Sequence, residues 1–500
     1  MPDFKIPLAG SYNTRVAATN VLSSSSGVVG VGIIGLMIVG LTGTTTTKDQ
    51  RFVNCFTERV SNPFIGKTTV YLVKRPGFAS SSTPEAGSIG NAILVWTGSS
   101  GKVMSCFGAT NSTLYDGTTG KGAITGKARG LTETFVGASV ATVAISSSDS
   151  TGWYYDVATG AATKITDADF PGNASLTTVG NFAHMAGFSF IMDTKAQIWN
   201  SDVNSLTAWT ASAFITASSY PDVGIGVVRK GDKIMAFGTE SVQFFYNAGL
   251  APAPLLPIEP MTIRVGAISA DAITEIGDTV FWAGSSPQGG VGIYQYGTGA
   301  QRISTPEIDS ILLLSGAGNI SLSAAKFYGR SFVIVQAGSV TFVYCIEEKA
   351  WHEWASTTPL WYKCAGVSTG SSQVTYAISK NSTSGKVFTI NPASLTFQDN
   401  GAAFSAIWQT SLLGEGNKRT FWDEVEIIGD RQTSASAMTI SYSDDDYQTY
   451  TTLGTVDLSD ARPRLTRCGS AYRRAWVGTH SANTPMRIEA LAGRKTVGTA

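Results

Sequence analysis

The stretch of this sequence that looks most like a nucleotide-binding site is VVGVGIIGLMIVGL, residues 28–41. Gly30, Gly32 and Gly35 match GxGxxG, the pattern that holds a dinucleotide pyrophosphate when a strand leads into the glycines and a helix leads out. Here a run of serines precedes the glycines, β-branched residues follow them, and Asp49 is the first acid. This context argues against a nucleotide site, and we expect no bound cofactor.

A second pattern, SNPFIGKT at residues 61–68, resembles the phosphate loop GxxxxGK[ST] with Ser61 in place of the first glycine. A phosphate loop must open a helix, whereas TVYLVKRPG follows here and has the pattern of a strand ending in a turn. We therefore expect the bend of a hairpin that joins RFVNCFTERV to TVYLVKR.

Residues that could support hydrolysis or bind a metal are few. The three histidines, at positions 184, 352 and 480, belong to no hydrolytic motif, and His352 stands among aromatic residues that predict a packed side chain. The five cysteines form no CxxC pair. The stretch SDDDYQTY (443–450) approximates an Asp box, a hairpin turn whose carboxylate accepts backbone N–H groups. We expect no catalytic residue and no metal.

The apolar stretch has a different interpretation. Residues 27–41 are too short and too glycine-rich for a membrane helix, with five glycines among fifteen residues. Their β-branched residues predict a strand pair covered by protein, and the alternative is a membrane-active or channel-gating loop. The interface candidates are Val28, Val29, Val31, Ile33, Ile34, Leu36, Met37, Ile38 and Val39.

The densest positive charge lies in RPRLTRCGSAYRRAWVG, residues 462–478. Arginines at this density suit a phosphate backbone or an acidic partner surface, and the alternative is an edge strand that arginines keep soluble. The DNA- or partner-facing candidates are Arg462, Arg464, Arg467, Arg473 and Arg474.

The composition of the whole chain sets these motifs in context. Of 500 residues, 36 are Lys or Arg and 36 are Asp or Glu, so no global field attracts nucleic acid. Charged residues make up 14% and glycines number 54, as in a turn-rich all-β protein with much covered surface. This low charge favours a large permanent assembly, because it leaves a lone monomer poorly protected against association. The odd cysteine count and the absence of a leader pattern predict folding in the cytoplasm.

The elements that must carry these residues are short strands. Meanders such as DKIMAFGTESVQFFYNAG (232–249) recur at irregular spacing, which predicts the four-stranded blades of a propeller. We expect an all-β protein with an N-terminal apolar segment and hairpin as an interface region (1–84), a β-propeller (85–395) and a sandwich-like C-terminal β-domain (396–500).

Three ordered segments resemble one family, the packaged-DNA stabilisation or tail nozzle (hub) proteins of short-tailed bacteriophages. The first is KDQRFVNCFTERVSNPFIGKTTVYLVKRPGF (48–78), with its "RFVN-x-aromatic" strand and "KRPG". The second is VGIGVVRKGDKIMAFGTESVQFFYNAG (223–249). The third is Arg467, Gly469 and Arg473, followed by Arg474 and Trp476.

The resemblance implies a non-enzymatic virion protein, made and assembled in the host cytoplasm. It would form a homohexameric tube below the portal and adaptor rings, hold packaged double-stranded DNA without reading its sequence, take part in ejection, and contact the tail needle, plug or tailspike. The rival class is a propeller that binds or hydrolyses glycans, which needs a pair of carboxylates at the propeller mouth. A cellular propeller scaffold is a third possibility, although it would not account for the ordered segments.

Overall fold

The computed structural model describes residues 4–7, 51–62, 67–96, 102–136, 140–287, 290–356, 362–367, 373–380, 383–414 and 417–498. The chain divides into two compact units. Unit 1 comprises Met1–Ala79, Ser339–Pro359 and Ser394–Ala500, and unit 2 comprises Ser80–Gly338 and Leu360–Ala393. The chain therefore passes from one unit to the other four times.

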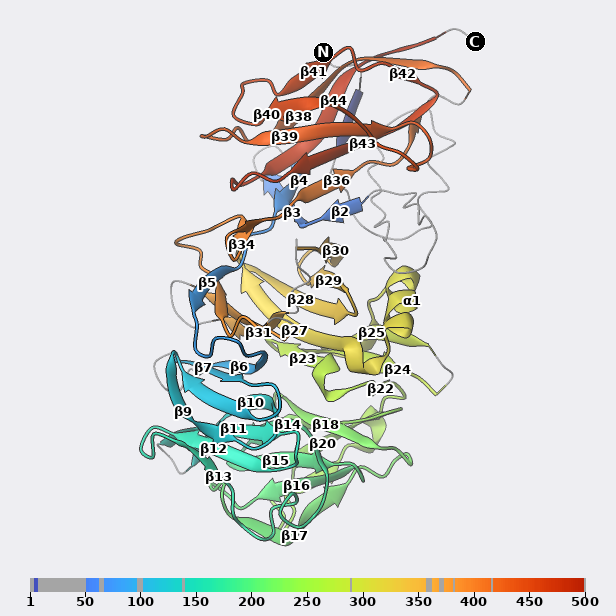
Figure 1. Ribbon diagram of the computed structural model, residues 1–500. Helices are drawn as coiled ribbons and strands as arrows, with labels where there is room; N and C mark the ends of the chain where they lie inside the picture. The colour runs from blue at the N-terminus through green and yellow to red at the C-terminus, as the bar shows by residue number, and fades with distance from the viewer. Residues whose placement is uncertain are drawn as a thin grey trace. The chain divides into compact units, whose positions relative to one another are not determined.

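Unit 2 is built from antiparallel meanders, in which each strand pairs with the next along the chain (Figure 1). The first sheet contains β6 (Gly90–Trp96), β7 (Lys102–Phe107), β8 (Ser112–Asp116) and β9 (Thr119–Ile124). The second contains β10 (Ala128–Val136), β11 (Val140–Ser147), β12 (Gly152–Asp156) and β13 (Ala162–Lys164). The third contains β14 (Thr178–Met185), β15 (Phe188–Asp193), β16 (Gln197–Ser201) and β17 (Trp209–Thr216).

The later sheets of unit 2 keep the plan with variations. The fourth contains β18 (Gly224–Lys230), β19 (Lys233–Gly238), β20 (Val242–Asn247) and β21 (Leu255–Pro257). In the fifth, β22 (Gly266–Ala267) and β23 (Ile273–Ile276) both pair with β24 (Thr279–Ser285), followed by β25 (Val291–Tyr296) and β26 (Ala300–Arg302). Helix α1 (Pro306–Ser315) leads to the hairpin of β27 (Ile320–Phe327) and β28 (Arg330–Ala337).

The last sheet of unit 2 closes the ring. It contains β31 (Tyr362–Val367), β32 (Thr375–Ser379) and β33 (Val387–Ile390), and its outermost strand is β5 (Ala79–Ser82), which precedes the first sheet in the sequence. The first strands contact one another in the order β6, β10, β14 and β18, and again in the order β23, β27, β31 and back to β6. Over the described residues, unit 2 is thus a propeller of seven blades.

The cores of the propeller lie between adjacent blades. Trp96 of the first blade meets Tyr155 of the second with 5.8 Å between ring centroids, and Phe237 of the fourth meets Trp282 of the fifth at 5.6 Å. Buried aromatic rings such as these contribute the largest apolar areas to a core. Glycine permits the closest approach of two blades, because a Cβ on Gly180 (φ +70°) would lie 2.7 Å from the Cα of Gly226.

Unit 1 contains a sandwich of two layers, whose strands are antiparallel except for the parallel pair of β2 and β30. One layer has the order β3 (Cys55–Asn62), β4 (Lys67–Lys74), β44 (Arg487–Val497), β38 (Thr420–Gly429) and β41 (Arg464–Thr466), and β1 (Phe4–Pro7) and β42 (Ser470–Ala471) pair with β44 and β38. The other layer has the order β40 (Thr451–Asp457), β39 (Ala437–Ser443), β43 (Arg473–His480), β36 (Ala406–Gln409), β2 (Arg51–Val53), β30 (Ala350–Trp354) and β29 (Val340–Cys345), with β37 (Leu413–Gly414) on β43.

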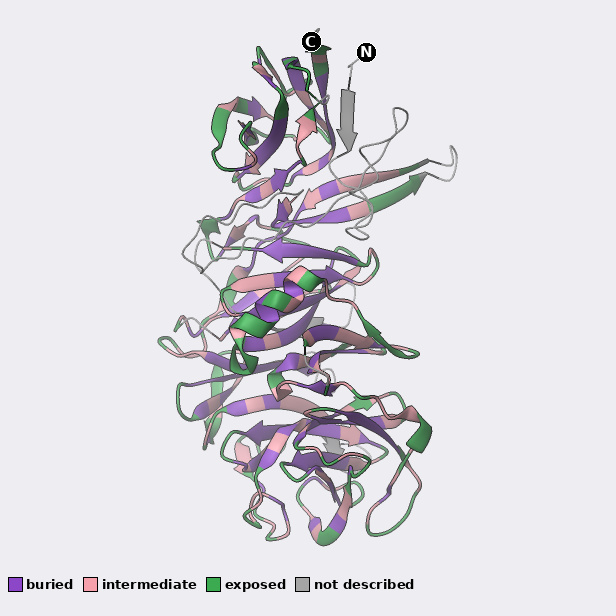
Figure 2. Cartoon of the chain, turned by 90° about the vertical axis from the view of Figure 1, so that its right-hand side faces the viewer, coloured by how far each residue is buried: buried purple, intermediate pink, exposed green. Residues whose placement is uncertain are grey.

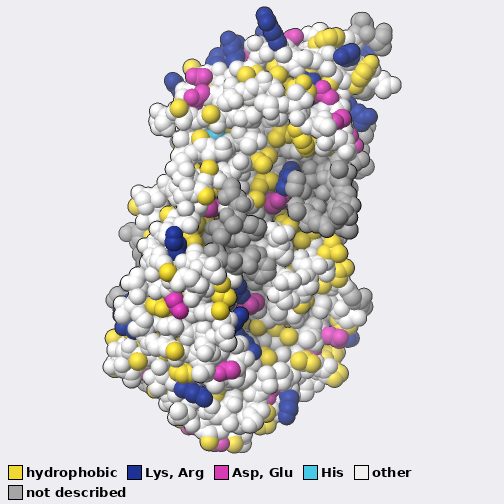
Figure 3. All heavy atoms as spheres, viewed as in Figure 1, with side chains coloured by type: hydrophobic (Ala, Val, Ile, Leu, Met, Phe, Trp, Pro, Cys, Tyr) yellow, Lys and Arg dark blue, Asp and Glu magenta, His cyan; other side chains and the backbone are white. Residues whose placement is uncertain are grey.

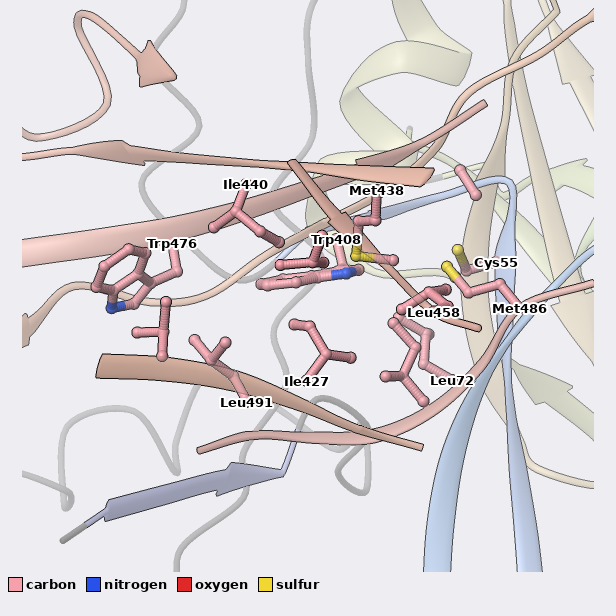
Figure 4. Packing of buried hydrophobic residues seen from close by; sticks show 14 of the residues in the cluster. Cys55, Leu72, Trp408, Ile427, Met438, Ile440, Leu458, Trp476, Met486 and Leu491 are labelled. Carbon is pink, nitrogen blue, oxygen red and sulfur yellow. The ribbon is translucent and has the colours of Figure 1, made fainter. Parts of the chain in front are cut away.

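A single apolar core joins the two layers of the sandwich. In Figure 4 the Trp408 ring lies between Ile440 and Met438 of one layer and Ile427 of the other. Strand β38 alternates buried and exposed residues over residues 420–423, whereas β43 is buried at five consecutive positions, residues 474–478. Figure 2 shows buried residues (purple) along the strands and many exposed residues (green) in the connections. Residue Cys55 of the N-terminal hairpin belongs to the same core, so the N-terminal hairpin and the C-terminal strands form one structural unit.

The fold class expected from the sequence is confirmed: the chain is all-β, with a propeller, an N-terminal hairpin and a C-terminal sandwich. Of the phosphate-loop-like stretch, Ser61 and Asn62 end β3 and Lys67 and Thr68 begin β4, with Asn62 opposite Lys67, so a strand stands where a phosphate loop would need a helix. No helix among the described residues combines the length and the apolar character of a membrane span.

Candidate functional site

The five predicted arginines lie on β41, on β43 and in the turns beside them, in three different environments. Arg462 and Arg464 lie on the outer face of the sandwich beside two glutamates of β38. Arg462 donates from Nε and Nη2 to the Glu426 carboxylate at 3.1 and 2.7 Å, and this hydrogen bonding lowers the pKa of Glu426. Lys and Arg side chains (dark blue) gather over this part of the sandwich in Figure 3.

Glu424 is the centre of a wider charge cluster. Its carboxylate lies 3.4 Å from Arg462 and from Arg464, and 3.5 Å from Arg494 of β44. The glutamate side chain is mostly buried, whereas the three arginines are about half exposed. Because Glu424 and Glu426 offset two of the three positive charges, most of the positive field of this face is neutralised internally.

Arg474 lies apart from the other four. Its side chain is buried, and Nε and Nη2 donate to the Asp444 carboxylate, both at 2.7 Å. The guanidinium lies 3.8 Å from the Tyr442 ring centroid, and Nη1 donates to the Cys468 carbonyl. With its donors occupied and its plane covered, Arg474 holds the sandwich together and does not present its charge to a partner.

Arg467 and Arg473 are exposed. Arg467 has a positive φ of +59°, and its backbone N–H donates to the Asp423 carbonyl. Arg473 begins β43 opposite Gly414. Of the predicted partner-facing set, these two are therefore the exposed arginines that form no ion pair with a residue that the structure describes. The apolar interface candidates, Val28 to Val39, lie outside the described residues.

The Asp-box-like turn is formed by one carboxylate. Asp445 Oδ1 accepts the backbone N–H groups of Gln448 and Thr449 at 3.1 and 2.9 Å, and its Oδ2 accepts the Thr449 hydroxyl. These bonds, led by that of the Thr449 hydroxyl, lower the pKa of Asp445 to about 2. Tyr447, which stands where an Asp box has glycine, adopts φ +67°. The acidic run therefore serves the turn between β39 and β40.

The first of the three family-like segments converges on a buried ion pair in unit 1. Arg75 donates from Nη1 and Nη2 to the Asp399 carboxylate at 3.0 and 2.6 Å, and both side chains are almost fully buried. Its Nε donates to Asn54 Oδ1 at 2.8 Å, and the guanidinium lies 3.9 Å from the Phe404 ring centroid. Asn54 of "RFVN" and Arg75 of "KRPG" thus belong to one buried hydrogen-bond network with Asp399, which we call the node. The node has a structural role.

A second buried group lies beside this node. Lys74 Nζ donates to the Ala482 carbonyl at 2.8 Å and lies 3.4 Å from His480 Nδ1, while His480 Nε2 lies 2.8 Å from Ser436 Oγ. Burial lowers the pKa of Lys74 to about 8 and that of His480 to about 4. His480 is therefore neutral at physiological pH.

Unit 2 contains a cavity of about 710 Å³ at its centre. Its walls come from six first strands or their neighbours, and its charged side chains are Glu133, Arg229, Asp271 and Glu275. The Glu275 side chain is exposed to solvent, but the surrounding cavity wall partly desolvates its carboxyl. This desolvation raises the pKa of Glu275, and the positive charge of Arg229 acts in the opposite direction. Lys380 pairs with Asp271 at 2.6 Å.

A match to a protein-family model shows the family to which the chain belongs. The model described as "Bacteriophage P22 Gp10, beta-propeller" (Phage_stabilise) matches residues 41–376, which is more than half of the chain. The chain belongs to this phage stabilisation family. The resemblance seen in the sequence is confirmed, and the phage stabilisation protein described here is a structural protein of a bacteriophage.

Other comparisons add little about this member of the phage stabilisation family. No curated protein sequence matches it. Raptor from Chaetomium thermophilum is 11% identical, with a TM-score of 0.39 over 63% of this chain and 28% of that one, so this chain spans well under half of Raptor. BamB from Moraxella catarrhalis is 11% identical (TM-score 0.37; 68% and 97% covered). A chain of a mitotic checkpoint complex is 12% identical (TM-score 0.40; 63% and 92% covered). At these values the likenesses carry no argument about function.

Sequence reasoning missed two features of the phage stabilisation protein. The acids that pair with the arginines, Glu424 and Asp444, lie 30 or more residues before them in the chain. The alternating pattern of TFWDEVEIIG, which puts Glu424 and Glu426 on one face of a strand, was the available signal for the first. Nothing in the local sequence pointed from Arg75 to Asp399.

Proposed function

We propose that this phage stabilisation protein is a tail nozzle or hub subunit of a short-tailed virion. Copies of the chain, six in the arrangement that the sequence resemblance implies, form a tube that extends the channel of the portal and adaptor rings. The tube retains packaged double-stranded DNA, passes it during ejection and meets a needle, plug or tailspike. The family match over residues 41–376 is the observation that carries this proposal.

The charge arrangement supports a channel that does not grip DNA. Non-specific DNA affinity grows with the number of phosphates that Lys and Arg neutralise. In the sandwich, Arg474 is buried against Asp444, and Arg462 is paired with Glu426. With zero formal net charge, the chain suits a tube through which DNA slides. We place the protein in the virion, after assembly in the host cytoplasm.

A non-enzymatic role agrees with the uses of the polar groups. His480 and Asp445 serve buried or turn hydrogen bonds. In the part of the chain that the structure describes, no group of three or more His, Cys, Asp and Glu side chains could hold a metal ion. We therefore propose neither a cofactor nor a metal for this function.

Electron microscopy of the protein with the portal and adaptor of its source virus tests the proposal. We expect an axial ring of copies that extends the portal channel. A protein that leaves the portal bare and decorates the particle laterally would overturn the nozzle role.

A glycan-directed propeller is the second candidate, because Glu133 and Glu275 both line the central cavity of unit 2. A glycoside hydrolase needs two such carboxylates, one of them with a raised pKa, and desolvation by the surrounding cavity wall raises the pKa of Glu275. Incubation with host surface polysaccharide distinguishes the two. Oligosaccharide release by the native protein, lost in Glu275→Gln, would favour this second function.

A further inference from the structure

One end of the sandwich exposes aromatic side chains where the chain crosses from β42 to β43. Phe421 is 46% exposed and Tyr472 is 58% exposed, the latter among the highest values for a large apolar side chain in unit 1. Phe421 is paired with Ser470 of β42 and Thr496 of β44, and Tyr472 lies two residues beyond Ser470. Two large rings in water at one end of a sheet are a costly arrangement unless something covers them.

Three exposed arginines lie on the same segments of the chain as these rings. Arg419 directly precedes β38, two residues before Phe421, and donates from Nε to Ser470 Oγ at 3.0 Å. Arg467 is held at the Asp423 carbonyl, and Arg473 follows Tyr472. None of the three arginines forms an ion pair with a residue that the structure describes, which separates them from the arginines around Glu424. We call Arg419, Phe421, Arg467, Tyr472 and Arg473 the end patch.

The charge of the end patch is positive. Its five residues include three arginines and no acid. Asp423, two residues from Phe421 on β38, accepts the Thr496 hydroxyl at 3.3 Å and forms no ion pair with the three arginines. Arginine and tyrosine are also the residue types that most often dominate binding energy at protein interfaces, where an apolar centre is desolvated and a polar rim surrounds it.

We propose that the end patch docks a second virion protein whose contact surface has an apolar centre and a rim of carboxylates. The inference rests on the proposed function, and it assigns the exposed arginines of the sandwich to protein contact. DNA offers phosphates for the arginines but no apolar surface to cover Phe421 and Tyr472 from the outside of a duplex. A partner with both chemistries satisfies all five residues.

Binding to virus particles that carry the portal and adaptor but lack this chain tests the inference. An apolar variant, Phe421→Ser with Tyr472→Ala, and a charge variant, Arg467→Glu with Arg473→Glu, are compared with the native protein by co-sedimentation. Leu313→Ser with Leu314→Ser is the matched control, because these side chains of α1 in unit 2 are 66% and 67% exposed. A 30-base-pair DNA duplex is the second probe.

We expect both end-patch variants to bind the particles at least about 30-fold more weakly, as for loss of an interface hot spot. The control should bind within about twofold of the native protein, since exposed positions away from an interface contribute little. All variants alter exposed side chains, so their thermal unfolding should match that of the native protein. If the apolar variant unfolds at a lower temperature than the native protein, the binding of the charge variant tests the inference, because that variant removes no packed side chain.

Native binding by both end-patch variants would overturn the inference and leave the proposed function intact. Loss of DNA-duplex binding in parallel with loss of particle binding, in the charge variant alone, would also overturn it, because the surface would then face DNA. A native protein that does not bind the particles would remove the proposed function, and this inference with it.

Discussion

Arg75 and Asp399 are 324 residues apart in the sequence and form a buried two-bond ion pair, with Nη–Oδ distances of 3.0 and 2.6 Å. Asp399 Oδ1 also accepts the backbone N–H of Phe78 at 3.0 Å. The pair fixes the segment that leaves β4 against the segment that leads into β36. It explains in physical terms why "RFVN" and "KRPG" occur together, since Asn54 is a further side-chain partner of Arg75.

Removal of one member of this pair should be severe. Arg75→Ala leaves the Asp399 carboxylate buried and uncompensated, and we expect about 3–5 kcal/mol of destabilisation of unit 1 in urea unfolding. Lys102→Ala, which breaks the more exposed pair with Asp116, is the control and should cost about 0–1 kcal/mol. Equal effects of the two substitutions would contradict this account of the node.

At Gly77, beside the Arg75–Asp399 pair, two backbone segments approach closely. A Cβ at Gly77 would lie 2.1 Å from the Gln398 carbonyl oxygen, so Gly77→Ala must displace backbone and should cost at least about 1–3 kcal/mol. At Gly299 a Cβ would meet nothing within 4 Å, and Gly299→Ala should be nearly neutral. Differential scanning calorimetry of both variants makes the comparison.

His480 should make stability depend on pH. Burial, with the nearby Lys74 charge, lowers its folded-state pKa from 6.5 to about 4, so between these values the unfolded chain binds a proton that the folded chain does not. Stability should therefore fall as pH drops from 6.5 towards 4, by up to roughly 3 kcal/mol.

Ser436 and Thr484 also face this ring and do not titrate. His480→Gln should flatten the slope of unfolding free energy between pH 4 and 6.5, whatever its effect at pH 7. An unchanged slope would place the acid sensitivity elsewhere.

Asp445 should control the β39–β40 turn locally. Asp445→Ala removes the acceptor for the backbone N–H groups of Gln448 and Thr449, and these two amides should exchange faster with deuterium. Asp446→Asn removes the neighbouring charge while keeping a residue type that tolerates the positive φ of this position, and it serves as the control. Because the pKa of Asp445 is about 2, protection in the native protein should persist to well below pH 4.

The buried and the exposed arginines of residues 462–474 need separate tests. Arg474→Ser alone should destabilise unit 1, because the substitution breaks a buried pair with Asp444. Serines at Arg462, Arg464, Arg467 and Arg473, with Arg474 retained, should leave the fold intact. DNA retention by particles that carry the four-serine protein then reports on the exposed charge alone, with thermal unfolding as the check on folding.

The sequence predicted the local structure well where short-range chemistry decides it. DKIMAFGTESVQFFYNAG became β19 and β20 around a turn, and SDDDYQTY became a carboxylate-bonded turn. Burial of Arg474 escaped prediction because its partner Asp444 lies 30 residues earlier, in the stretch that was expected to form an Asp-box-like turn. The cavity residues Glu133 and Glu275 escaped because their proximity depends on how the blades close into a ring.

Strand β5 supplies the outer edge of the last blade although it is made before the first. The pairing of β5 with β33 can therefore form only after β33, some 300 residues later, has been synthesised. Until then the ring has two unpaired ends. Once fastened, neither end of the ring can fray without breaking pairs made by the other. The propeller ring is thus closed by pairing between the two ends of its own chain segment, which leaves no blade edge free to separate on its own.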